Sequence, residues 1–260
     1  MATFLFDDII FGPVKSRRLG VSLGINLLPT KKKICNFNCI YCECGWTRDI
    51  EKAVSHLPTR DQVYKALELK LLEMSVTGKA PDVITYAGNG EPTLHPNFPG
   101  IIDDSIFLRD KYFPNSKIAV LSNSTTIDNP LIKAALLKID MNILKLDSAI
   151  ESTLKIHNQP RIPVKIEELI ENLVGFKGRV IIQTLFLRGR YNNIVIDNTT
   201  KPEIDAWLNA IERIKPSEVM IYTISRDTPE GSQLKKVPVK ELRGIAALVE
   251  SLGIKTQVSG

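Results

Sequence analysis

The sequence predicts an α/β fold built on parallel strands. Short, mostly apolar stretches alternate along the chain with longer stretches whose apolar residues recur every three or four positions. Strands that read as continuous apolar runs are typical of parallel sheets covered on both faces. Polar segments follow several of these strands, at the end where parallel α/β folds place their sites. The pattern fits an open doubly wound sheet or a barrel.

The first half of the chain begins this alternation. Residues 20–28 alternate well enough to be a strand and are closed by a proline. Residues 59–76 carry apolar side chains three or four apart and stop before a glycine and a proline, which predicts a helix. The apolar runs 83–87 and 117–122 predict two further strands, joined by a weaker helical pattern at 99–112.

The second half continues in the same order. A polar excursion from Arg188 to Thr200 interrupts it, and residues 1–19 form a polar, basic approach to the first strand. The remaining helices are expected at 129–138, 164–175, 202–214 and 238–252, and the remaining strands at 142–146, 179–187, 218–224 and 254–258.

Composition indicates a soluble globular protein. Hydrophobic residues make up 43% and charged residues 24% of the 260 positions. The 34 Lys and Arg against 29 Asp and Glu permit an anionic partner without arguing for one. No apolar run approaches the roughly 18 residues of a membrane span, and the N-terminus does not read as a secretory signal. We therefore expect a single domain over residues 1–260, located in the cytoplasm and without a membrane partner.

Three of the four cysteines form a compact motif, Cys35-x3-Cys39-x2-Cys42. Thiolates suit iron–sulfur clusters, which normally take four protein ligands, so three ligands leave one iron open. A zinc site completed by Cys44 or His56 is the alternative, although structural zinc sites usually use paired motifs. Without signs of export, the motif reads as metal or redox ligands and not as disulfides.

Polar residues at the ends of later strands suggest a shared site. In Gly88-Asn-Gly-Glu91 the glycines allow close backbone approach and the carboxylate suits an ammonium group, although Asn-Gly is also a common turn. Lys145 supplies a point charge at another strand end. Gln183 is polar within an otherwise apolar run, and such residues are functional or bonded to a neighbour.

The cysteine motif, which reads C-x3-C-x-aromatic-C, and the Gly-Asn-Gly-Glu-Pro segment together resemble the signature of the radical S-adenosylmethionine (radical SAM) superfamily. The resemblance implies a partial (β/α)6 TIM-type barrel over about residues 12–226, with a C-terminal helix–strand extension at about 227–260. It implies a [4Fe–4S] cluster held by Cys35, Cys39 and Cys42, with SAM on the open iron.

The resemblance also implies which residues contact SAM. The aromatic residue of the motif packs near the adenine, and the Gly-rich segment receives the methionine amine. Polar residues of later strands reach the ribose and carboxylate, and the apolar edge of the strand at 218–224 flanks the adenine. These residues are Tyr41, Gly88, Asn89, Gly90, Glu91, Ser122, Asn123, Lys145, Gln183 and Ile224.

The implied activity is reductive cleavage of SAM to a 5′-deoxyadenosyl radical that abstracts hydrogen from a substrate. The cofactor radical performs the abstraction, so no catalytic side chain is assigned. The electron comes from an external donor of the flavodoxin or ferredoxin type, since Cys44 is the only other cysteine in the sequence and one cysteine is too few for a second cluster.

The segment Phe11-Gly-Pro-Val-Lys-Ser-Arg-Arg-Leu-Gly20 is similar to short Fe–S oxidoreductases related to the catalytic domain of wyosine synthases. A small-molecule or nucleoside enzyme would use residues 188–200 as a lid. A tRNA-modifying enzyme would need Lys31–Lys33 to converge with Arg188 and Arg190. A peptide-modifying enzyme would need a groove, and a non-catalytic zinc or Fe–S module is an alternative of another class.

Other polar residues are expected to be solvated. His157 stands in a polar loop and receives no catalytic role, and Cys44 reads as a free thiol. Several arginines are candidates for binding an anionic substrate or phosphate, although charged loop residues are mostly solvated: Arg17, Arg18, Arg188, Arg190 and Arg226.

Overall fold

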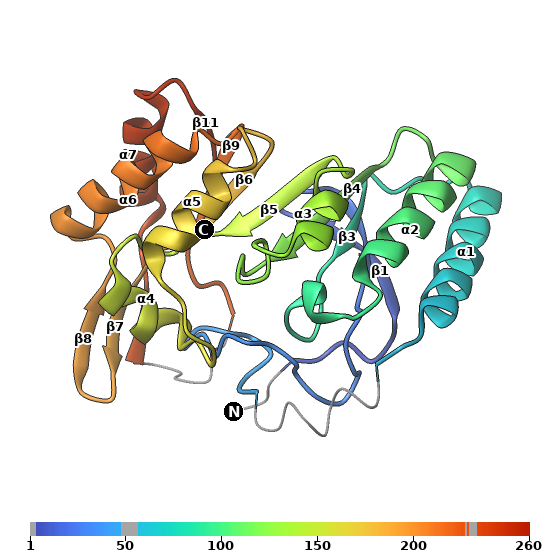
Figure 1. Ribbon diagram of the computed structural model, residues 1–260, viewed down its shortest axis with the longest axis horizontal. Helices are drawn as coiled ribbons and strands as arrows, with labels where there is room; N and C mark the ends of the chain where they lie inside the picture. Colours follow the sequence, from blue (N-terminus) through green and yellow to red (C-terminus); the bar gives the residue numbers. More distant parts are fainter. Residues whose placement is uncertain (1–3, 48–56, 227, 229–232) are drawn as a thin grey trace.

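The computed structural model describes residues 4–47, 57–226, 228 and 233–260. Figure 1 shows a strongly curved sheet with helices along its outer side. The strands of this sheet are β1 (Ile10–Ser16), β2 (Gly20–Ile25), β3 (Val83–Tyr86), β4 (Lys117–Ser122), β5 (Met141–Lys145), β6 (Ile181–Leu185), β9 (Glu218–Tyr222) and β11 (Lys255–Ser259).

The eight strands lie in the order β1-β2-β3-β4-β5-β6-β9-β11. From β2 onward each strand pairs with its neighbour in parallel, whereas β1 pairs with β2 antiparallel. The sheet curls into a half-barrel whose two edges, β1 and β11, do not pair with each other. The structure confirms the predicted α/β class and the partial barrel.

Helices connect successive parallel strands and cover the outer face of the sheet (Figure 1). The first helix begins at a capping box formed by Thr59 and Gln62. It ends at Gly78, which has the left-handed conformation and is the glycine at which the sequence predicts the end of the helix. The helices are α1 (Arg60–Thr77), α2 (Phe98–Tyr112), α3 (Pro130–Leu136), α4 (Glu151–Asn158), α5 (Ile166–Val174), α6 (Lys201–Ile214) and α7 (Val239–Glu250).

The sequence patterns missed five elements and extended a sixth, strand β2, too far. Residues 10–16, expected as an approach segment, form edge strand β1, and α4 was not expected. The polar excursion at 188–200 is the hairpin β7 (Leu187–Tyr191) and β8 (Ile194–Asp197), and β10 (Leu234–Lys236) pairs with β7. The expected strand 20–28 ends at Ile25. The hairpin strands lack a continuous apolar run, because only some of their residues, such as Leu187 and Ile196, are buried.

Because side chains alternate along each strand, the sheet has one apolar layer on each of its two faces. One face packs on the helices, and the other lines the inside of the half-barrel. The inner layer forms a floor of one residue per strand: Val83, Ala119, Ile143, Ile181 and Met220. The next inward position on β4, β5, β6 and β9 therefore lies above this floor, toward the carboxyl ends of the strands.

Helix α1 offers a test of the packing between the helices and the sheet. Leu71 is fully buried in this layer, whereas Leu69 on the same helix is 68% exposed. We expect Leu71→Ala to lower the free energy of unfolding by about 2–5 kcal/mol, because it leaves a cavity. Leu69→Ala should change it by less than about 0.5 kcal/mol. Urea denaturation measures both, and equal effects would contradict the assigned register of α1.

Candidate functional site

A cavity of about 290 Å³ lies at the carboxyl ends of the strands, above the apolar floor. Residues two positions beyond the floor line it, as the alternation along each strand requires. Most of the sequence-predicted site residues meet here. The lining residues are Arg18, Lys33, Cys35, Phe37, Cys39, Tyr41, Cys42, Glu43, Cys44, Gly88, Gly90, Glu91, Leu121, Ser122, Asn123, Lys145, Gln183, Leu185 and Tyr222.

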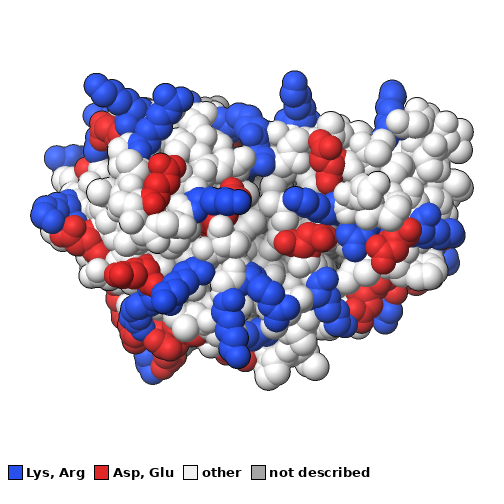
Figure 2. All heavy atoms as spheres, turned by 90° about the horizontal axis from the view of Figure 1, so that it is seen from above, with Lys and Arg blue, Asp and Glu red and all other residues white. Residues whose placement is uncertain are grey.

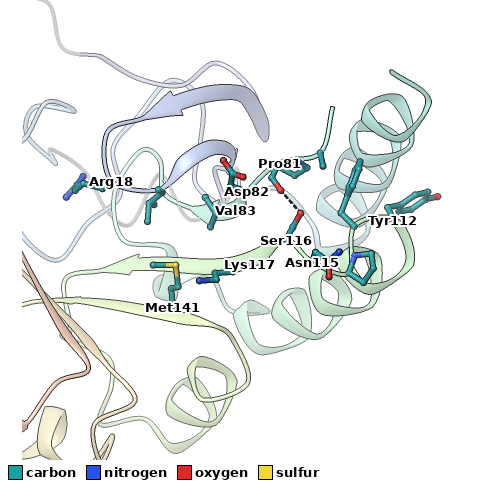
Figure 3. Close-up of a pocket in the computed structure, with 13 residues that line it drawn as sticks. Arg18, Pro81, Asp82, Val83, Tyr112, Asn115, Ser116, Lys117 and Met141 are labelled. Carbon is teal, nitrogen blue, oxygen red and sulfur yellow. Dashed lines mark hydrogen bonds between the residues drawn. The ribbon is translucent and has the colours of Figure 1, made fainter. Parts of the chain in front are cut away.

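A second and larger cavity, about 580 Å³, opens at the amino ends of β3, β4 and β5 (Figure 3). Two of its polar side chains are bonded within the protein: Ser116 Oγ donates to the Pro81 carbonyl, and the Asp82 carboxylate accepts from the Val21 amide at 2.7 Å. Cysteines do not line it. We place the candidate site in the smaller cavity, because its lining carries the reactive chemistry.

The cysteine loop is held in place by backbone hydrogen bonds to two other segments. The Ile34 amide donates to the Asn89 carbonyl at 2.9 Å, and the Glu91 amide donates to the Ile34 carbonyl at 3.0 Å. On the other side, the Asn38 amide donates to the carbonyl of Asn158 at 2.9 Å. The loop therefore spans from the end of β3 to the end of α4.

The Gly-rich segment after β3 packs directly under this loop. Gly90 has φ +135°, and a Cβ there would lie 1.8 Å from the Ile34 carbonyl oxygen, so only glycine fits. The Asn89 side chain points out of the cavity: it donates to the Phe6 and Pro29 carbonyls, both at 2.9 Å. Asn89 thus anchors the N-terminal segment, and the structure does not bring it together with the other predicted site residues.

Three amide N–H groups point at the cysteine sulfurs. The Phe37 backbone amide lies 3.4 Å and Asn123 Nδ2 lies 3.5 Å from Cys35 Sγ. Asn158 Nδ2 lies 3.4 Å from Cys39 Sγ. Such donors stabilise thiolate charge and tune iron–sulfur potentials. The donor set of three thiols with surrounding N–H groups therefore fits an iron–sulfur cluster.

Burial and neighbouring charges shift the pKa values of these thiols in different directions. Burial raises the pKa of Cys35 to about 12 and also raises the pKa of Cys39. A hydrogen bond with the Cys44 thiol lowers the pKa of Cys42 to about 5, against the effect of burial. Burial opposes the charge on Lys33, but the nearby cysteines raise the pKa of its ammonium overall. Lys33 thus supplies positive charge beside the sulfurs.

Within the described residues, no three His, Cys, Asp or Glu side chains converge closely enough to share one metal ion. Cys44, a candidate fourth zinc ligand, lines the cavity and donates from its thiol to the Gly88 carbonyl at 3.5 Å. His56, the other candidate, lies outside the described residues.

Asp147 joins the separate parts of the site, and the sequence patterns did not single it out as a site residue. Its Oδ2 accepts hydrogen bonds from the Tyr41 hydroxyl and from Asn158 Nδ2 at 2.7 Å. Its Oδ1 accepts from the Leu185 amide at 2.9 Å. Lys145 Nζ lies 3.5 Å from the carboxylate, whose negative charge raises the pKa of Lys145 although burial opposes it. Its sequence signal is its place in Lys145-Leu-Asp-Ser148, at the end of a predicted strand.

Glu91 and Asn123 form a second polar connection. The buried Glu91 carboxylate accepts from Thr93 Oγ1 at 2.6 Å and from the Asn123 amide at 2.6 Å. Burial raises the pKa of Glu91 above its usual range. Ile224 lies in the apolar cluster around Cys35 and Cys39 but does not line the cavity.

His157 is fully buried, so the expectation that it is exposed was wrong. It lies on α4 next to Asn158, and its carbonyl accepts from the Ile40 amide of the cysteine loop at 3.0 Å. Neither ring nitrogen has a hydrogen-bond partner among the described residues. Burial lowers the pKa of His157 to about 4.

Several known proteins are similar to this chain in sequence. No family model matches the chain. It is 32% identical over 257 residues to UPF0026 protein MJ1312 of Methanocaldococcus jannaschii, which covers 96% of this chain and 74% of the relative. A UPF0026 protein of Helicobacter pylori strain J99 is 28% identical, covering 94% and 74%. A GTPase Obg of Brachyspira hyodysenteriae is 29% identical over 84% of this chain, but the chain spans only 30% of that protein's length.

Solved structures share the fold at low sequence identity. A radical SAM methyltransferase from Sphaerobacter thermophilus matches with a TM-score of 0.67 at 13% identity, over 92% of this chain and 65% of that one. SuiB of Streptococcus suis, bound to its precursor peptide, matches at 0.62 and 12%, over 91% and 48%. Archaeal TYW1 matches at 0.53 and 14%, over 88% and 71%. The chain thus has the fold of radical SAM enzymes, and none of the helices in its described part is long and apolar enough to cross a membrane.

Removing the Asp147 carboxylate should destabilise the protein. Asp147→Ala leaves the largely buried Lys145 ammonium without its carboxylate, and we expect the free energy of unfolding to fall by about 3 kcal/mol or more. Asp128, exposed in a turn, is the matched control, and Asp128→Ala should have an effect within about 0.5 kcal/mol. Chemical denaturation at pH 7 measures both, and a neutral Asp147→Ala would refute the role given to this carboxylate.

His157 should make stability depend on pH. The unfolded chain takes up a proton near pH 6.5, whereas the folded chain does so only near pH 4, so acid favours unfolding between these values. Between pH 7 and pH 5.5 the wild type should lose about 1 kcal/mol more unfolding free energy than His157→Phe. Denaturation curves at the two pH values measure this difference. Equal losses in the wild type and in His157→Phe would show that folding does not lower the pKa of His157.

Proposed function

The chain belongs to the UPF0026 protein family, and we propose that it is a radical SAM enzyme that cleaves S-adenosylmethionine reductively at a [4Fe–4S] cluster. The observation that carries the proposal is that three thiols and the polar residues of several strand ends line one cavity of a half-barrel. Cys35, Cys39 and Cys42 would hold the cluster. When bound, cluster and SAM supply one-electron cleavage of a carbon–sulfur bond and a carbon radical that takes hydrogen from the substrate.

The residues of the chain would bind and orient these groups. N–H donors from Phe37, Asn123 and Asn158 would stabilise the negative sulfurs. Glu91 would accept a hydrogen bond from the methionine ammonium, and Lys145 would pair with the methionine carboxylate. Both already have fixed positions through their own hydrogen bonds.

Further residues would position the nucleoside. Tyr41, which donates its hydroxyl to Asp147, would present its ring toward the adenine, and Gln183 would reach the ribose. The apolar side chains of Phe37 and Leu185 line the same cavity and would exclude water from the radical. The electron would come from an external flavodoxin or ferredoxin, and we expect the protein to act in the cytoplasm.

A small-molecule substrate is favoured over tRNA by the basic residues. The tRNA hypothesis needed Lys31–Lys33 to converge with Arg188 and Arg190, but Lys33 is buried beside the cysteines and Arg188 pairs with Asp197 and Glu241. On the face seen in Figure 2, Lys and Arg lie among Asp and Glu instead of forming one continuous basic surface. The segment 188–200 would serve as a wall of the site, because Ile196 is buried in the apolar cluster around Cys35 and Cys39.

Anaerobic reconstitution with iron and sulfide tests the proposal. The wild type should bind about four irons per chain, become brown and release 5′-deoxyadenosine from SAM with a chemical reductant. The triple variant Cys35→Ala, Cys39→Ala, Cys42→Ala should lose both the absorbance and the product. Cys44→Ala is the matched control from the same loop and should retain the cluster.

Metal analysis separates this function from a non-catalytic module. A protein that retains zinc and takes up no iron would contradict the enzyme assignment. A triple variant that keeps the brown absorbance would contradict the ligand assignment.

A further inference from the structure

Five charged side chains line the cysteine cavity, and four of them have a partner of their own. Lys33 Nζ donates to the Gly45 carbonyl at 2.8 Å. Lys145 Nζ donates to the Tyr222 hydroxyl at 3.3 Å and lies near the Asp147 carboxylate. The two acidic groups are also engaged, since Glu43 pairs with Arg226 at 2.8 Å and Glu91 accepts from Thr93 and Asn123.

Arg18 is the exception. Its guanidinium makes no hydrogen bond or ion pair to any described residue, and Nη1 is buried without a partner. It lies over the Tyr222 ring, 4.8 Å from the centroid, which leaves its N–H edges free. A guanidinium carries five donors in a planar fork that matches a carboxylate or phosphate group. A buried donor without an acceptor costs free energy that an anionic ligand would recover.

The backbone of Arg18 is fixed by two hydrogen bonds, and the guanidinium is held by its contact with the Tyr222 ring. It stands in the turn between β1 and β2, where its amide donates to Ser16 Oγ at 3.3 Å. Its carbonyl accepts from Gln257 Nε2 at 3.1 Å, which ties the turn to β11 across the open side of the half-barrel. Leu19 packs on the apolar floor beside it. The guanidinium is therefore held inside the barrel.

Arg18 also borders the larger cavity, but the contacts point to the cysteine side. Figure 3 shows Arg18 at the far side of the larger cavity from Tyr112 and Asn115. Tyr222, over which the guanidinium lies, lines only the cysteine cavity of these two. A ligand bound next to the cysteines is thus the one that Arg18 can reach together with Tyr222.

We propose that Arg18 binds a carboxylate or phosphate group of the substrate, so that the enzyme acts on an anionic small molecule. This inference rests on the proposed function for the identity of the site. SAM brings a carboxylate of its own, for which Lys145 is the proposed partner, so Arg18 remains for the second molecule. The cavity then offers one cation to each anionic group.

Isothermal titration of the cluster-free protein with inorganic phosphate and with acetate tests the anion site without requiring any radical chemistry. At least one probe should bind the wild type, and Arg18→Gln should weaken that binding at least tenfold. Arg18→Lys keeps the charge without the planar fork and should give an intermediate loss. Arg17→Gln is the matched control, since Arg17 is exposed and donates to Ser225 Oγ at 2.9 Å, and it should bind like the wild type.

Titration of the reconstituted protein with SAM separates the two sources of a carboxylate. Arg18→Gln should bind SAM within about threefold of the wild-type affinity, and phosphate or acetate should still bind the SAM-loaded wild type. A tenfold loss of SAM affinity in Arg18→Gln would overturn the proposal, because Arg18 would then hold the SAM carboxylate. The proposal would also be overturned if neither probe bound the wild type, or if both Arg18 variants bound the probes as tightly as the wild type does. A chain that binds the probes through Arg18 but assembles no cluster would refute the proposed function alone.

Discussion

The site depends on one buried carboxylate. Asp147 accepts hydrogen bonds from Tyr41 in the cysteine loop, from Asn158 at the end of α4 and from the backbone of Leu185 at the end of β6. A buried charge is tolerated only when it is fully paired, and here the nearby Lys145 ammonium completes the pairing. Because these partners come from four segments, satisfying one carboxylate also fixes the cysteine loop over the barrel mouth.

The same strands supply an apolar floor and a polar cavity because side chains alternate along them. Ile143 and Lys145 lie on one face of β5, and Ile181 and Gln183 lie on the corresponding face of β6. The first residue of each pair packs in the floor, and the second lines the cavity two positions later. On these two strands the polar side chains that face the cysteine cavity thus lie at the carboxyl ends, above the apolar floor.

The open side of the half-barrel determines where the β1–β2 turn and its Arg18 lie. Strands β1 and β11 do not pair, and the β1–β2 turn bridges the gap: the Arg18 carbonyl accepts from Gln257 Nε2 on β11, and the Arg17 side chain donates to Ser225 Oγ. This bridge carries Arg18 into the interior. Solved radical SAM enzymes share the fold at 12–14% identity, so what distinguishes this chain lies in such positions and not in the barrel itself.

The sequence by itself determined the order of helices and parallel strands, because apolar periodicity is a local property that each segment shows on its own. It also determined the cysteine motif and most strand-end residues that meet in the cavity, including Lys145 and Gln183. Tertiary structure decided which polar side chains turn inward: Asn89 leaves the cavity to bond the N-terminal segment, whereas Arg18 enters it. The hairpin β7–β8 and the buried His157 were decided there too. The reason is that register, curvature and the gap between β1 and β11 bring distant segments together, and no local pattern records those contacts.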